Sequence, residues 1–172
     1  AVNDAPIAEN GPMALDEDIV SSIDLADLIS DVDGDNLSIS ISASTSNGIL
    51  VNSGGTIYEF TPTLNYYGTD LFKYTVDDGN GGNAEGTVGI TVSPINDDPT
   101  GNDADIITDE DEPYMGDLGD LSDINDVDGD TLVYTFPANS AGGGLIQQLG
   151  TGPNFRYTSL ENYNSDVDGD DS

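Results

Sequence analysis

An internal repeat is the feature that most constrains how this chain can fold. Three short motifs return in the same order, 93 to 95 positions later. NDAP at residues 3–6, DED at 16–18 and DVDGD at 31–35 return at 96–99 (as NDDP), 109–111 and 126–130. A conserved order with slowly growing spacing is the signature of tandem structural units. The sequence therefore predicts two homologous domains, residues 1–95 and 96–172.

Alternating apolar and polar residues predict that each unit is built from β-strands. LSISISA, FKYTV and VGITV each have an apolar residue at every second position, which places these side chains on one face of an extended strand. Seven strands are expected in the first unit, at about residues 7–15, 20–25, 37–44, 48–52, 56–62, 71–77 and 84–93. One helical turn is expected at 26–30. This number of strands in a domain of this size is typical of an immunoglobulin-like β-sandwich, so an all-β fold of tandem sandwiches follows.

The second unit is shorter than the first. Alignment of the repeats places Ser172 near Leu71, so this unit is expected to lack its last two strands within the chain. An unfinished sandwich exposes strand edges that invite pairing. We expect these edges to be completed by further sequence or by strands of another copy, which makes neighbouring repeats and other copies candidate partners.

The charge is strongly one-sided. Lys73 and Arg156 are the two basic residues against 34 acidic ones, a net charge of −32. Nucleic acids and anionic membranes bind clustered Lys and Arg, so neither is an expected partner. No apolar run has the length of a membrane span, so direct insertion into a membrane is not expected. The chain is instead expected to bind cations.

The chain contains neither His nor Cys. The usual acid-base and nucleophilic arrangements of active sites are therefore missing, and no enzyme is expected. Zinc and copper favour His and Cys ligands, so neither is an expected cofactor.

The DVDGD motif predicts a calcium site. Its three carboxylates crowd one tight loop with no nearby Lys or Arg, and the repulsion calls for a counterion. Calcium accepts six to eight oxygen ligands in a tolerant geometry, whereas magnesium prefers a small octahedral shell. The spacing is not that of an EF-hand. The alternative is a solvated acidic turn, because Asp-Gly is a common turn dipeptide. The candidate ligands are Asp31, Asp33 and Asp35 in the first unit and Asp126, Asp128 and Asp130 in the second. A third copy, at residues 166–170, is expected from the repeat alignment to lie in a lengthened loop.

These motifs together carry a family resemblance. NDAP, the early DED, DVDGD, FTPTLNYYGTDLFKYTVDDGNGG and TVGITVSPINDDP resemble the cadherin-like or VCBS-type repeats of large bacterial adhesins. The resemblance implies cadherin-like sandwiches stiffened by Ca²⁺ at or near the joints between domains. It implies a first set of ligands at the amino end and a second at the linker. The added residues are Asn3, Asp4 and Glu17 in the first set, Asn96, Asp97 and Glu110 in the second, and the loop residues Asp77 and Asp78, for which a plain hairpin turn is the alternative.

The expected function is that of an extracellular structural repeat at the bacterial cell surface, with a role in surface or biofilm adhesion. Cell-surface glycans or proteins are its candidate targets. Two other functions stay open. One is a subunit of an extracellular fibre or surface layer completed by strand exchange. The other is a carbohydrate-binding module using Tyr66, Tyr67 and Tyr163, although Tyr66 and Tyr163 are expected to pack inward as tyrosine corners.

Overall fold

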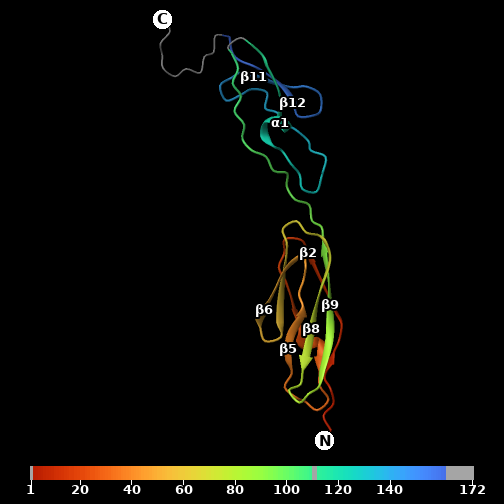
Figure 1. Ribbon diagram of the computed structural model, residues 1–172. Helices are drawn as coiled ribbons and strands as arrows, with labels where there is room; N and C mark the ends of the chain where they lie inside the picture. Colours follow the sequence, from red (N-terminus) through yellow and green to blue (C-terminus); the bar gives the residue numbers. More distant parts are fainter. Residues whose placement is uncertain (1, 110–111, 162–172) are drawn as a thin grey trace, which may run out of the picture. The chain divides into compact units, whose positions relative to one another are not determined.

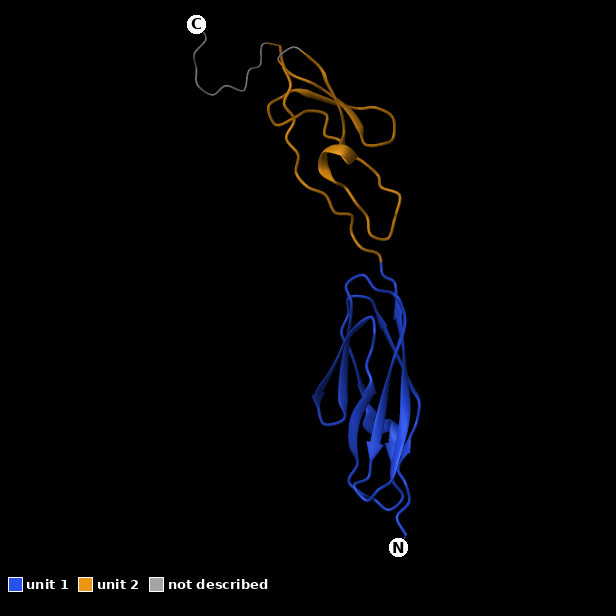
Figure 2. Ribbon diagram, in the orientation of Figure 1, with its two compact units in different colours: residues 1–95 blue, residues 96–172 orange. Residues whose placement is uncertain are grey.

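The structure is a computed structural model that describes residues 2–109 and 112–161. It divides into two compact units, residues 1–95 and 96–172, which are coloured separately in Figure 2. Three of the sequence predictions lie outside the described residues: those for Glu110, Tyr163 and the third DVDGD motif.

Unit 1 is a β-sandwich of two sheets (Figure 1). The larger sheet has the order β2-β9-β8-β5, and the smaller has the order β3-β7-β6. Strand β2 pairs with β9 in parallel, and the other neighbours pair antiparallel. The larger sheet consists of β2 (Gly11–Asp16), β5 (Ser38–Ala43), β8 (Gly68–Asp77) and β9 (Asn83–Ser93). The smaller consists of β3 (Ser21–Asp24), β6 (Gly48–Gly54) and β7 (Ile57–Pro62).

The all-β sandwich predicted from the alternating residues is confirmed, with one strand divided. The first predicted strand is interrupted at Glu9 and Asn10, where the chain changes partners. Before the break, β1 (Ile7–Ala8) pairs with the short β4 (Ile29–Ser30), and after it β2 pairs with β9. The expected helical turn is the 3₁₀ helix η1 (Leu25–Leu28).

The core of unit 1 lies between the two sheets. Phe72, Tyr74 and Val76 alternate along β8 and are fully buried, and Phe60 on β7 is buried opposite them. Burial of this apolar surface is the main source of stability for a domain without disulfides. The hydroxyl of Tyr74 donates a hydrogen bond to the carbonyl of Glu9 (2.6 Å). Burial raises the pKa of Tyr74, with a further contribution from the charge of Glu9.

The sandwich has two ends that lie far apart. The last pair of β8 and β9 at one end is Asp77 with Asn83, and at the other it is Gly68 with Val92. Because a strand rises about 3.3 Å per residue, these ends are separated by roughly 30 Å. We name the end beside Asp77 the entry pole, because Asn3 and Asp4 lie there. The opposite end, beside Ile95, is the exit pole.

The described part of unit 2 contains a three-stranded antiparallel sheet of order β10-β12-β11. Its elements are β10 (Tyr114–Asp117), the helix α1 (Leu118–Ser122), β11 (Leu145–Gln148) and β12 (Asn154–Thr158). Phe155 on the central strand is buried, and its ring lies 5.5 Å from that of Phe136, between centroids. Among the residues described in the two units, no helix is both long and apolar enough to cross a bilayer.

Candidate metal centre

The first DVDGD loop folds around the carboxylate of Asp31. Its Oδ1 accepts hydrogen bonds from the backbone N–H groups of Asp33 (2.9 Å) and Asp35 (3.2 Å). Gly34 has a φ of +78°, in the left-handed region that glycine adopts without strain. This glycine lets the backbone curl, and the curl brings the side chains of the three aspartates to one side of the loop.

The three carboxylates form a compact group of oxygens. One ligand oxygen from each of Asp31, Asp33 and Asp35 lies within 4.8 Å of the other two. Oδ2 of Asp31 and Oδ2 of Asp35 are inaccessible to solvent and accept no hydrogen bond. A buried, unpaired carboxylate oxygen is costly, so this arrangement fits a cation that would supply the missing partner.

No side chain of unit 1 compensates these charges. Lys73 is the sole basic residue of the first 95, and its Nζ lies 3.0 Å from Oε1 of Glu85, on the surface of the larger sheet. The donor set consists only of oxygens, which is the ligand type of calcium and magnesium. The geometry therefore suits a hard divalent cation.

The amino-terminal segment contacts both the DVDGD loop and the β8–β9 loop at the entry pole. The backbone N–H of Asp4 donates to Oδ2 of Asp33 (2.8 Å), and Nδ2 of Asn3 donates to Oδ2 of Asp78 (2.8 Å). Asp78 is buried, and its Oδ1 accepts from the backbone of Asn80. The hydrogen bond from Asn3, followed by those from the loop backbone, lowers the pKa of Asp78 despite the opposing effect of its burial.

Asp77 and Asp78 differ in what their carboxylates contact. Oδ1 of Asp77 accepts from the N–H of Gly79 (2.7 Å), which is the contact expected of a plain hairpin turn. Asp78 instead connects the β8–β9 loop to Asn3. The structure thus brings Asn3, Asp4 and Asp78 to the same pole as the DVDGD loop, although they are far from it in the sequence.

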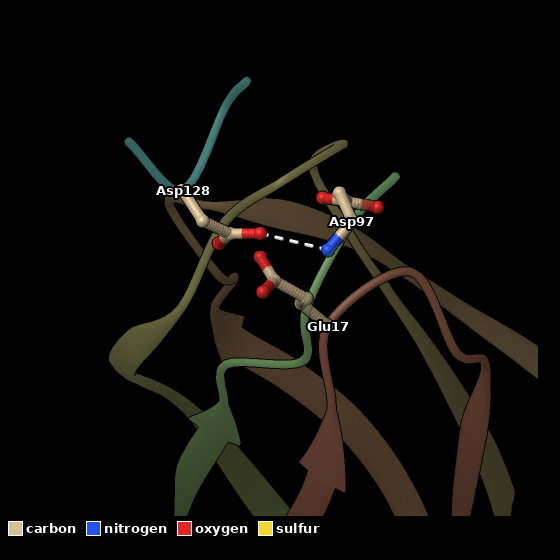
Figure 3. A group of neighbouring side chains, drawn as sticks. All are labelled: Glu17, Asp97 and Asp128. Atoms are coloured by element: carbon tan, nitrogen blue, oxygen red, sulfur yellow. Dashed lines mark hydrogen bonds between the residues drawn. The ribbon is translucent and has the colours of Figure 1, made fainter. Parts of the chain in front are cut away.

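Unit 2 repeats the hydrogen-bonding frame of this loop. The N–H of Asp130 donates to Oδ1 of Asp126 (3.0 Å), as Asp35 does to Asp31. The N–H of Asp97 donates to Oδ2 of Asp128 (2.7 Å), as drawn in Figure 3. Gly129 has a φ of +76°, matching that of Gly34. The neighbouring predicted residue, Asn96, donates its Nδ2 to the carbonyl of Asp97 (3.0 Å).

The grouping of Glu17 with the amino-terminal set is wrong. Glu17 follows β2, which runs parallel to β9, so its position is at the exit pole. Its side chain is buried there, and its Oε1 accepts from the N–H of Ile95 (2.9 Å). The DED motif is close to the DVDGD loop in the sequence, but the length of the sandwich separates them.

One carboxylate with several hydrogen bonds was not predicted from the sequence. Asp70 on β8 accepts from the backbone N–H groups of Ser46, Asn47 and Leu71. These bonds order the β5–β6 turn, which is a structural role. Asp70 falls within the stretch FTPTLNYYGTDLFKYTVDDGNGG, but it does not belong to a cluster of carboxylates, so no signal pointed to its role.

The two tyrosines considered for sugar binding lie differently. The Tyr66 hydroxyl donates to the carbonyl of Thr69 (2.8 Å), and the ring packs against the core, which confirms the inward placement expected for it. Tyr67 is 59 % exposed. A single exposed ring is normal for a protein surface and is not evidence of a binding platform.

The sequence of unit 1 matches a known protein family. The model of the bacterial Ig domain matches residues 3–91, just over half of the chain. The chain belongs to the bacterial Ig domain family. Domains of this family are commonly structural parts of extracellular and surface proteins. No curated protein matches the chain.

Several solved structures resemble this bacterial Ig protein in part. An endo-fucoidan hydrolase of glycoside hydrolase family 107 is 19 % identical over 92 % of the chain, with a TM-score of 0.42. A second endo-fucoidan hydrolase of that family is 23 % identical over 51 %, with a TM-score of 0.38. A nucleoside hydrolase-related protein from Saccharophagus degradans is 21 % identical over 54 %, with a TM-score of 0.43. The chain spans 25 %, 16 % and 26 % of these three structures, respectively.

Proposed function

We propose that this bacterial Ig protein is a calcium-binding structural repeat of an extracellular adhesin. The observation that carries the proposal is the pair of buried carboxylate oxygens, Oδ2 of Asp31 and of Asp35, that accept no hydrogen bond. Together with an oxygen of Asp33 they would bind a calcium ion, and water or backbone oxygens would complete its shell.

Calcium would act on this domain as a stabilising counterion. Extracellular modules bind calcium with dissociation constants of about 0.1 to 1 mM, so the site would be filled outside a cell and empty in the cytosol. At 100 times the dissociation constant, binding adds about 2.7 kcal/mol to the free energy of unfolding. That is a large fraction of the roughly 5 to 15 kcal/mol typical of a domain.

The ion would also order the entry pole. The backbone of Asp4 contacts Asp33, and Asn3 contacts Asp78, so neutralising the DVDGD loop would strengthen the attachment of the amino-terminal segment. The role is mechanical and non-enzymatic: a stiffened domain that supports adhesion to glycans or proteins at a surface. Stiffening of the segment that joins the two units stays a prediction from the repeated motifs.

Calorimetric titration of the full chain with CaCl₂ tests the proposal. The double substitution Asp31→Asn, Asp33→Asn is expected to remove the binding contributed by unit 1, and the matched Asp126→Asn, Asp128→Asn variant tests the repeat of the loop in unit 2. Asp27→Asn, an exposed residue on η1, serves as control. Titration with MgCl₂ should release much less heat. If calcium binds the wild type and the first variant with equal stoichiometry, the site at Asp31 does not exist.

A further inference from the structure

Strand β6 is an edge strand with hydrogen-bonding groups on its open side. It forms the end of the sheet β3-β7-β6 and is paired with β7 only. The N–H of Thr63 donates to the carbonyl of Asn47 (2.9 Å), which fixes the alternation along the strand. From Asn47 onward, every second residue bonds toward β7, and the residues between them face the open side. Gly48, Leu50 and Asn52 therefore direct their N–H and C=O groups outward.

Pro62 supports this assignment independently. It lies opposite Gly48 in the register of β6 and β7, at a position where no N–H is needed for pairing. The irregularity between Asn52 and Gly54 lies beyond this segment, near the hairpin turn. Residues 48–52 thus form a regular five-residue edge.

The outer face of this edge is apolar. Ile49 is 68 % exposed and Val51 is 47 % exposed, whereas Leu50 packs against the core. The strand has the sequence GILVNSG, without a charged residue or proline. Natural edge strands are commonly guarded by charge, proline, bulges or short length. β6 has none of these features between residues 48 and 52.

The other edges of unit 1 are better protected. Strand β5 presents Ser38, Ser40 and Ser42 outward, and its register shifts between Ile41 and Ala43. Strand β3 has only four residues and ends in Asp24. Strand β2, the remaining edge, contains Pro12, so among the described strands of the sandwich β6 is the edge best suited to accept a further strand.

We propose that β6 pairs with β6 of a second copy of this chain, antiparallel, about a two-fold axis at Leu50. In this register Leu50 lies opposite Leu50 of the second copy, and Gly48 lies opposite Asn52. The outward N–H and C=O groups of these residues then form the ladder. Ile49 lies opposite Val51 twice, in the non-hydrogen-bonded pairs where side chains come closest. The strand is therefore complementary to itself in both backbone and side chains.

Electrostatics favours this edge over other surfaces of so acidic a domain. Strand β6 is uncharged, so its pairing sets no carboxylates directly opposite each other. The nearest acidic residue of the outer face is Glu59, opposite Val51 on β7. In the dimer the two Glu59 residues are three strand spacings apart and offset by two residues along the strands, a separation of about 16 Å, which exceeds the Debye length of about 8 Å at physiological salt. Pairing is expected to strengthen with added salt and to need no calcium, which separates it from the proposed metal site.

Cysteine pairs test the register directly, because the native chain has no cysteine. The variant Ile49→Cys is mixed with Val51→Cys under mild oxidation. The expected product is the mixed disulfide, formed at least fivefold faster than either homodisulfide, since only residues 49 and 51 lie opposite each other. Equal rates for all three products overturn the proposed register.

Sedimentation equilibrium of the full chain tests the association itself. At high protein concentration and 0.5 M NaCl, with a chelator present, the mass should approach twice 17.9 kDa. The double variant Ile49→Lys, Val51→Lys places lysines opposite each other and should remain monomeric. The control Ile57→Lys, Thr61→Lys adds the same charge to the outer face of the central strand β7 and should still dimerise. A monomeric wild type, or a dimer that the β6 lysines leave intact, overturns the proposal.

Discussion

Replacing Asp31 with asparagine is expected to stabilise unit 1 without calcium and to remove most of its response to calcium. The amide retains an oxygen that can accept from the backbone N–H groups of Asp33 and Asp35 as the carboxylate does. The fold of the loop is therefore preserved while one negative charge is removed.

The magnitude follows from the spacing of the three carboxylates. Two unit charges at the 4.8 Å limit of this group repel by about 0.9 kcal/mol at a dielectric constant of 80 and about 3.5 kcal/mol at 20. Asp31 takes part in two of the three pairs. Because Asp33 is exposed and Asp31 and Asp35 are only half-buried, the value nearer the water-like limit is used for both pairs, and the relief is about 2 kcal/mol. For a domain of this size that raises the melting temperature by about 10 °C.

In calcium, the wild type is expected to gain more stability than the variant. At 10 mM and a dissociation constant of about 0.1 mM, calcium should add about 2.7 kcal/mol to the wild type, a rise of at least about 10 °C. The variant has lost a ligand and should gain only a few degrees. Thermal unfolding is followed through the amide NMR signals of β8 and β9, which report on unit 1, in chelator and in CaCl₂.

The control for this experiment is Asp27→Asn, which makes the same change of charge at an exposed site on η1 and should alter neither melting temperature by more than about 2 °C. A variant that is less stable than the wild type in chelator would show that Asp31 is a structural anchor rather than a repelled ligand. A wild-type melting temperature that does not change in 10 mM calcium would refute the site.

Three further predictions concern unit 1. Tyr74→Phe should lower the free energy of unfolding by about 1 kcal/mol in urea denaturation, because the hydroxyl loses its 2.6 Å hydrogen bond to a backbone carbonyl. Gly48→Ala should cost about 1 to 3 kcal/mol in the same assay, since a Cβ would overlap the buried ring of Phe60. Asn3→Ala removes the main cause of the lowered pKa of Asp78. The variant should therefore be less stable than the wild type at pH values above 3.8, the ordinary pKa of an Asp side chain. That difference should shrink as the pH falls below 3.8 through the lowered pKa of the native state, and calcium-free urea unfolding from pH 7 to pH 2.5 measures it; a difference independent of pH contradicts the role of Asp78.

The strands were predictable wherever one face of a strand is buried. Phe72, Tyr74 and Val76 alternate in the sequence because they alternate between core and surface. The break at Glu9 and Asn10 was not predicted, because both halves of that segment are extended and differ only in their partners. The partner of a strand depends on residues far away in the chain, so the local alternation of apolar and polar residues does not predict it.

In the candidate metal site, too, contacts between residues close in the sequence were predictable and contacts between distant residues were not. The DVDGD loop was predictable because its hydrogen bonds join residues two and four positions apart. The contact of Asn3 with Asp78 spans 75 positions and was not predicted, because the family resemblance named both residues as candidate ligands without bringing them together. Glu17 was assigned to the wrong pole because the direction of β2 relative to β9 is a property of the whole sandwich.

The parallel pairing of β2 with β9 has a consequence for a protein under tension. β2 follows the segment that enters unit 1 at one pole, and β9 leads to the segment that leaves at the other. A pull on the two ends therefore drags these strands past each other along their length. The six paired positions between Gly11 and Asp16 and their partners on β9 are loaded in shear, so their bonds must rupture together rather than one after another. A domain with this strand connection is expected to resist stretching by flow until all the β2–β9 hydrogen bonds break together.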